Sequence, residues 1–450
     1  MSRLRLPAGA GRQLLTSTAG TLVLNVCAFG LNLLTTLLLA RILGQSGYGI
    51  YAYALALALL LTVPAVLGFN QLLVRDLSAY ETRQQWGLAR GLVVRSHQAV
   101  LVGSIAIAGL AAAACALIGS PGEQRTAVWI AFALVPLTAI ATIRQAITQA
   151  FRRAVVGRVP ETLIQPILLI LLVVAVRAFL TPFSGSEAVG LYVVSAVVAL
   201  VAGTVILART LPAQLRAARA EHDDAAWARA AFGLLLLAGV WSTSGQLSLV
   251  ILGAFKGADA VALYSIATKA AMAVSFLFGA ANYTLAPAVA RLHAAGDVVR
   301  LQALVTRAAR AVTLLSLPVA VILVVAGQPL LSLFGVRAAE GRVVLAILVV
   351  GIFLNVATGP VSQTLIMVGR QRDVTWTLAA GTALDVAGCI ALIPTWGVQG
   401  AAVADATTMV VTNAVMVWLL LRSRGIYAPA FGRSLFGVRE TPPASPVDVR

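Results

Sequence analysis

The sequence has little of what soluble enzymes and secreted domains depend on. Its 450 residues include three cysteines, three histidines and 16 acidic residues, and only 11% are charged. Cys27, Cys115 and Cys389 each stand inside an apolar run, which favours small packed residues over disulfides or metal ligands. His222 and its two acidic neighbours are typical of a solvated charged face. The sequence therefore predicts no metal site and no cofactor.

Apolar residues are abundant instead, at 60% of the chain with a mean hydropathy of +0.93. A soluble protein of this length cannot bury so much apolar side chain, whereas a polytopic membrane protein exposes it to lipid. The pattern predicts an all-α membrane protein with about twelve spanning helices. The expected spans are 18–40, 49–70, 98–118, 127–147, 163–181, 188–208, 232–254, 260–285, 311–334, 343–366, 374–394 and 398–421.

The basic residues are distributed unevenly about these spans. An even number of spans places both termini on one side, and 26 of the 33 basic residues fall on that side. Six fall on short outer turns, and Lys269 lies inside a span. Cytoplasmic loops carry such an excess of basic residues, so both termini are predicted to be cytoplasmic. Because the charge is spread over loops on one membrane face, nucleic acid is excluded as a partner.

A glycine-rich turn in Ala40–Ala54 indicates a helical hairpin in the membrane. Tyr48 and Tyr51 are expected near the lipid headgroups, where aromatic rings are favoured. The pattern returns in the second half, with Tyr264 213 positions after Tyr51, and Val-Gly-Arg at 156–158 recurs 212 positions later at 368–370. Six helices per half make this a parallel repeat, which predicts two six-helix lobes around a central cleft.

The expected organisation follows from this repeat. Residues 1–210 and 231–422 are predicted to form the two lobes, and residues 211–230 an interfacial cytoplasmic linker helix. Residues 423–450 are predicted to be a disordered cytoplasmic tail.

The first hairpin also carries a family resemblance. The run A-R-I-L-G-Q-S-G-Y-G-I-Y-A-Y-A from Ala40, and I-L-G-A-F-K-G-A-D-A-V-A-L-Y-S from Ile251, resemble bacterial polysaccharide-export flippases. These belong to the multidrug/oligosaccharidyl-lipid/polysaccharide exporter superfamily. The resemblance implies a non-enzymatic transporter in the bacterial cytoplasmic membrane. Its implied cargo is an undecaprenyl-pyrophosphate-linked oligosaccharide, flipped from the inner to the outer leaflet, with polysaccharide polymerase machinery as a partner.

Three alternatives remain open. A cation-coupled multidrug exporter of the same superfamily is disfavoured because the first six spans show no buried acidic residue. A lipid II flippase resembles a longer, fourteen-helix pattern. A membrane glycosyltransferase or polysaccharide ligase is disfavoured because the outer turns are short and all three histidines lie on the inner side.

Lys269 is the foremost candidate for contact with the cargo. It lies about 13 Å into its span, where a charge is costly unless it meets water, a ligand or a partner. It either faces the cleft and binds phosphate, or forms a structural ion pair with Asp385 or Asp405. Further cleft candidates share helix faces with it or lie on facing helices: Tyr264, Ser265, Thr268, Asn282, Asn25, Asn32, Gln246 and, at the outer mouth, Arg41. Asp385 and Asp405 are interpreted either as ion-coupling residues or as structural hydrogen-bonding groups.

Overall fold

The computed structural model describes residues 10–118, 122–179, 183–336, 338–424 and 429–430, and within these it contains helices but no strand. The first half of the chain forms α1 (Ala10–Ala65), α2 (Phe69–Thr82), α3 (Trp86–Ile118), α4 (Gly122–Phe132), α5 (Leu134–Ala150), α6 (Ala154–Val159), the π-helix η1 (Pro160–Ile164), α7 (Gln165–Phe179) and α8 (Gly185–Thr210). The predicted tail falls almost entirely outside the described residues.

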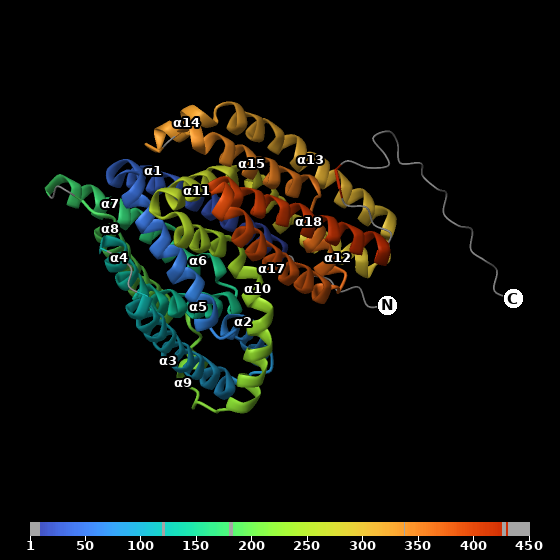
Figure 1. The fold of residues 1–450 in the computed structure, drawn as a ribbon. Helices are drawn as coiled ribbons and strands as arrows, with labels where there is room; N and C mark the ends of the chain where they lie inside the picture. Colours follow the sequence, from blue (N-terminus) through green and yellow to red (C-terminus); the bar gives the residue numbers. More distant parts are fainter. Residues whose placement is uncertain (1–9, 119–121, 180–182, 337, 425–428, 431–450) are drawn as a thin grey trace.

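The second half repeats this pattern of long helices. It forms α9 (Ala213–Ala217), α10 (Asp224–Lys256), α11 (Ala258–Ala271), the 3-10 helix η2 (Met272–Ser275), α12 (Phe276–Ala294), α13 (Val298–Val325), α14 (Gly327–Leu333), α15 (Ala338–Ala357), α16 (Val361–Met367), α17 (Gln371–Trp396) and α18 (Val398–Arg424). Figure 1 shows α3, α4, α5 and α8 on one side of the molecule and α12, α13, α15, α17 and α18 on the other. Between them lie α1 and α11, which pack against each other.

Nine helices of the described chain are long and apolar enough to cross a membrane. One of them, Val23–Ala65, contains two crossings, because its 43 residues are interrupted by non-helical Gly44. The broken pair α11–α12 and helix α10, whose Gly245–Lys256 portion is apolar, supply the other two. The twelve-span prediction is therefore confirmed. Large apolar side chains such as Leu110, Leu314 and Ile322 are exposed on the surface, as lipid contact requires.

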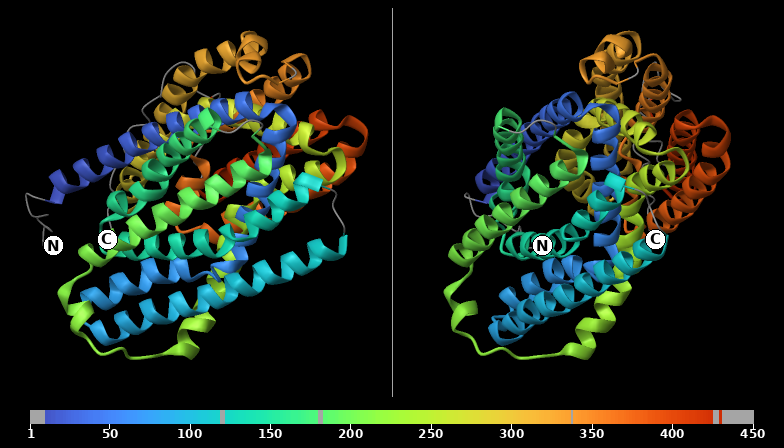
Figure 2. Two further views of the ribbon diagram at one scale, coloured as in Figure 1. Left: turned by 90° about the vertical axis from the view of Figure 1, so that its left-hand side faces the viewer. Right: turned by 60° about the vertical axis from the view of Figure 1, so that its left-hand side comes forward.

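Backbone turns at equivalent positions confirm the internal repeat. Gly44 (φ 69°, ψ −179°) and Gly257 (φ 78°, ψ −172°) break the first hairpin of each half and are 213 positions apart. This conformation is essentially restricted to glycine, because a Cβ would clash with the backbone. Gln84 (φ 58°) and Gly296 (φ 69°) form the next equivalent pair, 212 positions apart. Figure 2 shows the two bundles from two further directions.

One predicted correspondence of the repeat is wrong. The turn around Gly369 (φ 84°) is preceded by Val368 (φ −88°, ψ 10°) and followed by Arg370 (φ −101°, ψ 37°). The same three conformations occur in the first half at Phe151, Arg152 and Arg153, with φ 59° at Arg152. Gly369 therefore corresponds to Arg152 and not to Gly157, which lies inside α6. The recurrence of Val-Gly-Arg is a coincidence of sequence in an otherwise real repeat.

The linker between the halves is two helical pieces rather than the single helix predicted over 211–230. The five-residue α9 ends at Ala217, and α10 begins at Asp224. The intervening chain lies against α3, where Glu221 N donates to Gly87 O at 3.0 Å and a Cβ on Gly91 would lie 1.7 Å from Glu221 O. The Arg95 guanidinium binds Asp224 and holds the pKa of that carboxyl below its usual value. This non-helical segment can pack closely on α3 because Gly87 and Gly91 have no side chain in the way.

Candidate functional site

A cavity of about 690 Å³ lies between the two halves of the chain. Its lining comes from α1, η1, α7 and α8 of the first half and from α10, α11, α15 and α18 of the second. Polar side chains are present on both walls. Those predicted as site residues are Asn32, Gln246, Ser265, Thr268, Lys269 and Asp405, and those the sequence interpretation missed include Thr35, Glu161, Thr162, Gln165, Tyr192 and Asn355.

Lys269 lies on the α11 wall of this cavity and donates to two hydroxyl groups. Its Nζ is 3.0 Å from Thr36 Oγ1 and 3.0 Å from Tyr48 OH, both on α1. Among the ion pairs of the described residues, none joins Lys269 to a carboxylate. The ion pair with Asp385 or Asp405 is therefore not formed. Lys269 brings to the cavity a positive charge whose partners are neutral.

Tyr48 and Tyr51 are packed inside the protein, so their rings are not exposed to the lipid headgroups expected near them. Their side chains are buried at 0% and 4% exposure, and their rings lie 6.0 Å apart. Tyr51 makes an edge contact with Tyr192 on α8, with ring centroids 6.1 Å apart. The hairpin turn at Gly44 directs the start of the second span into the lobe interface, so these rings pack against protein there.

Asp385 and Asp405 form a second, buried polar cluster in the second half. Ser248 Oγ lies 3.0 Å from Asp385 Oδ2 and 2.7 Å from Asp405 Oδ1, and the Tyr264 hydroxyl donates to Asp405. Cys389 completes a group whose potential ligand atoms all lie within 4.8 Å of one another. Of the two carboxyl groups, Asp405 belongs to the cavity lining and Asp385 is 2% exposed. Two ionised carboxylates within 4.8 Å of each other in a dry interior repel strongly, so the Asp385–Asp405 cluster is suited to hold a shared proton or a cation.

A buried ion pair in the first half was missed by the sequence interpretation. Arg144, on α5, is 1% exposed, and its Nη2 lies 2.5 and 2.6 Å from the two carboxylate oxygens of Glu161. Glu161 follows Pro160 in η1 and belongs to the cavity lining. Glu161 is 19% exposed and lies in the span Ala154–Phe179, so the first six spans do bring an acidic residue to the cavity, which was not expected from the sequence. Arg144 was counted with the inner basic residues because it lies near the end of the predicted span 127–147, whereas α5 continues to Ala150 and keeps it within the helix.

Three other predicted residues, Arg41, Asn25 and Tyr264, are not part of the described cavity lining. Arg41 is exposed and its Nε donates to Leu333 O at 2.6 Å, which joins α1 to α14. Asn25 is not among the described lining residues. The side chain of Asn282 lies outside the described side chains. Tyr264 is not part of the described lining, but its hydroxyl donates a hydrogen bond to the lining residue Asp405.

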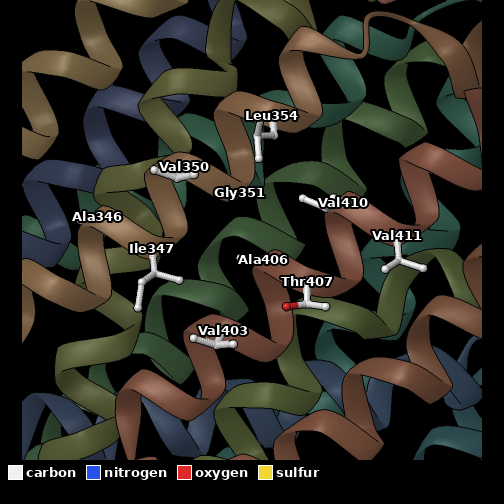
Figure 3. A pocket seen from close by; sticks show the side chains of 10 residues that line it. All are labelled: Ala346, Ile347, Val350, Gly351, Leu354, Val403, Ala406, Thr407, Val410 and Val411. Carbon is white, nitrogen blue, oxygen red and sulfur yellow. The ribbon is translucent and has the colours of Figure 1, made fainter.

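A separate apolar groove of about 490 Å³ lies between α15 and α18 (Figure 3). Figure 3 shows Ile347, Val350 and Leu354 on one of its sides and Val403, Thr407 and Val410 on the other. The two helices approach closely beneath it, because Gly351 stands where a Cβ would lie 2.8 Å from Ala406 Cβ. Lacking charged groups, this groove is suited to lipid chains and not to a polar cargo.

The fold is that of a two-lobed membrane protein with a polar cavity between its halves, and comparisons with known proteins agree with this fold. The family model described as "Polysaccharide biosynthesis protein" matches residues 14–293, and the model described as "MatE" matches residues 235–390. The chain belongs to the polysaccharide biosynthesis protein family. No protein of curated function matches the chain in sequence.

Three solved structures illustrate the shared fold. A multidrug resistance MATE family transporter of the MOP superfamily, in an inward-facing conformation, has a TM-score of 0.73 at 14% identity, covering 88% of this chain and 94% of that one. The lipid II flippase MurJ, in an inward closed conformation, has a TM-score of 0.70 at 12% identity, covering 88% and 86%. A MOP superfamily transporter from Pyrococcus furiosus, titled for the reverse polarity of its binding pocket, has a TM-score of 0.60 at 16% identity, covering 91% and 95%.

Proposed function

We propose that this chain flips an undecaprenyl-pyrophosphate-linked oligosaccharide from the inner to the outer leaflet of the bacterial cytoplasmic membrane. The observation that carries the proposal is Lys269, a cation on the wall of an inter-lobe cavity whose partners are two neutral hydroxyls. A charge at membrane depth without a counter-charge marks a functional site. A diphosphate headgroup supplies the missing negative charge, and the surrounding amides and hydroxyls suit a sugar.

Movement of the two lobes against each other is the proposed mechanism, with residues 1–210 and 231–422 as the moving units. The lobes touch at the end of the molecule that carries the hairpin turns. There Gln45 Nε2 donates to Asp259 O at 3.1 Å, and Gly49 packs so closely on Ala258 that a Cβ would lie 1.9 Å from its carbonyl oxygen. Under the predicted orientation, with both termini cytoplasmic, this is the outer end. In this proposal the cargo enters from the inner side, and its release on the outer side requires these contacts to separate.

The Asp385–Asp405 cluster is the proposed coupling element. Asp405 links the cavity to the buried carboxyl of Asp385 through the shared Ser248 hydroxyl. A proton or cation taken up here changes the charge of the wall of α18 that faces the cargo. The interaction energy between that wall and an anionic headgroup then differs between the loaded and unloaded cluster, as coupling demands.

A cation-coupled multidrug exporter is the second candidate, and one observation favours it. Glu161 and Asp405 both belong to the cavity lining, so the cavity carries carboxylates that an organic cation would meet. Glu161, however, is already neutralised by Arg144, whereas Lys269 has no acidic partner. An anionic cargo therefore gains more from this cavity than a cationic one.

Disruption of the gene in its native cells separates the two candidates. The flippase proposal expects loss of a surface polysaccharide and accumulation of the lipid-linked oligosaccharide on the cytoplasmic face, with unchanged sensitivity to lipophilic cations. Complementation with the intact gene is the control. Hypersensitivity to such cations with normal surface polysaccharide would support the exporter and reject the flippase.

A further inference from the structure

We propose that the wall of the cavity formed by η1, α7 and α8 binds the first sugar of the cargo, through Glu161 and Gln165 and against the rings of Tyr51 and Tyr192. This inference rests on the proposed function and divides the cavity in two. Lys269 on the opposite wall takes the diphosphate, and this wall takes the hydroxyl-rich carbohydrate. All four residues of the subsite belong to the cavity lining.

Glu161 is held in place from behind. Arg144 binds its carboxylate, and Gly203 of α8 leaves the space that the guanidinium occupies, since a Cβ there would lie 2.3 Å from Arg144 Cζ. The π-helix η1, a form found frequently at functional sites, presents Glu161 from the start of the span. Each carboxylate oxygen accepts more than one hydrogen bond, so acceptor capacity remains for sugar hydroxyls at the 19% of the side chain that is exposed.

Gln165 carries hydrogen-bonding capacity that the protein does not satisfy. The residue is 7% exposed, and its buried Nε2 lies beside the Tyr192 hydroxyl, with which it makes a weak polar contact but no well-aligned hydrogen bond. On the facing helix α11, Thr268 Oγ1 is likewise buried and unpartnered. Unpaired polar atoms in an interior are rare and costly, and both of these belong to residues that line the cavity. A ligand with hydroxyl groups supplies the missing partners after rotation of a flexible side chain.

A row of tyrosines connects the two walls. Lys269 Nζ binds Tyr48 OH, the Tyr48 and Tyr51 rings lie 6.0 Å apart, and Tyr51 meets Tyr192 at 6.1 Å. Tyr192 lies beside Gln165. Flat aromatic surfaces next to a carboxylate and an amide suit the alternating C–H and O–H faces of a sugar ring. The Arg144–Glu161 pair carries no net charge and offers the diphosphate no counter-charge, whereas Lys269 does, so the headgroup has one orientation.

The test compares two lipids on the purified full-length chain in nanodiscs. One is undecaprenyl pyrophosphate, and the other is undecaprenyl pyrophosphate carrying a disaccharide, each titrated with binding read by native mass spectrometry. Gln165→Ala is expected to weaken binding of the disaccharide lipid about tenfold and leave the bare lipid unchanged. Lys269→Ala is expected to weaken binding of the two lipids equally. Gln214→Ala, on the exposed α9, is the control and should match the wild type.

The outcomes distinguish failure of the sugar subsite from failure of the proposed function. Equal weakening of both lipids by Gln165→Ala, or no weakening of either, overturns the sugar subsite while the proposed function stands. Gln165→Met, which keeps the length of the side chain and removes its polar atoms, repeats the test if Gln165→Ala folds poorly. Failure of the wild type to bind either lipid rejects the proposed function and the subsite with it.

Discussion

Replacing Lys269 by alanine is expected to abolish transport while the protein still folds. The partners left behind are hydroxyls with other hydrogen bonds: Thr36 Oγ1 donates to Asn32 O at 2.8 Å, and Tyr48 OH lies 3.4 Å from Ser265 Oγ. No carboxylate is stranded, so the loss of stability is limited to about 1–2 kcal/mol. Had Lys269 been paired with Asp385 or Asp405, the loss would be about 3–5 kcal/mol.

The effect on cargo binding is expected to be larger than the effect on stability. Removing one partner of a desolvated, hydrogen-bonded charge pair costs about 2–5 kcal/mol, which is about thirtyfold or more in affinity. Lys269→Arg keeps the charge but presents a planar fork in place of a compact ammonium, so partial activity is expected.

The sequence provides a matched control, because Lys256 is its other lysine. Lys256 Nζ donates to Pro394 O at 2.9 Å and is exposed, away from the cavity lining. Lys256→Ala is expected to export the lipid-linked sugar at the wild-type rate. The assay measures membrane abundance and export together. A Lys269→Ala protein that accumulates normally and exports normally would refute the reasoning, and so would one whose abundance collapses and recovers when Asp405 is also replaced.

Three further predictions follow from backbone and packing. Gly203→Ala should lower the thermal unfolding midpoint because its Cβ would collide with Arg144, whereas Gly190→Ala on the same helix meets nothing within 4 Å and should not; equal midpoints would contradict the buried Arg144–Glu161 pair. Gly44→Ala and Gly257→Ala should each destabilise the purified protein by about 1–3 kcal/mol through the same left-handed backbone strain, and Gly30→Ala should not; an effect at one position alone would argue against equivalent hairpins. In a variant without native cysteines, Ser46→Cys should react with an impermeant reagent applied to intact cells and Arg219→Cys should not; the reverse pattern would invert the predicted topology.

Long apolar runs and charge asymmetry were enough to predict the architecture. The glycine turn at Gly44 predicted the first hairpin, and the spacing of Tyr51 and Tyr264 matched the offset of the turns at Gly44 and Gly257. These features are local, so a single sequence carries them. The correspondence of Gly369 with Arg152 was not visible in the sequence. A left-handed turn is normally marked by glycine, and in the first half an arginine occupies that position.

The site was only partly predictable, because its geometry depends on contacts between distant helices. Lys269 was identified since a charge within an apolar run is conspicuous. The hydroxyl partners of Lys269 are more than 200 positions away, so although Thr36 shares a helix face with Asn32, nothing in the sequence pairs either hydroxyl with Lys269. Arg144 and Glu161 lie near the ends of predicted spans, and only the packing of α5 against η1 and α8 shows that they form an ion pair.

Flipping by the purified chain in proteoliposomes tests the central claim most directly. The vesicles contain undecaprenyl-pyrophosphate-linked oligosaccharide in both leaflets, and a membrane-impermeant glycosidase is added outside. With the wild-type chain we expect nearly all of the oligosaccharide to become cleavable, and with Lys269→Ala about half, as in protein-free vesicles. Cleavage that stops at about half with the wild-type chain, or that proceeds fully with Lys269→Ala, would contradict the account.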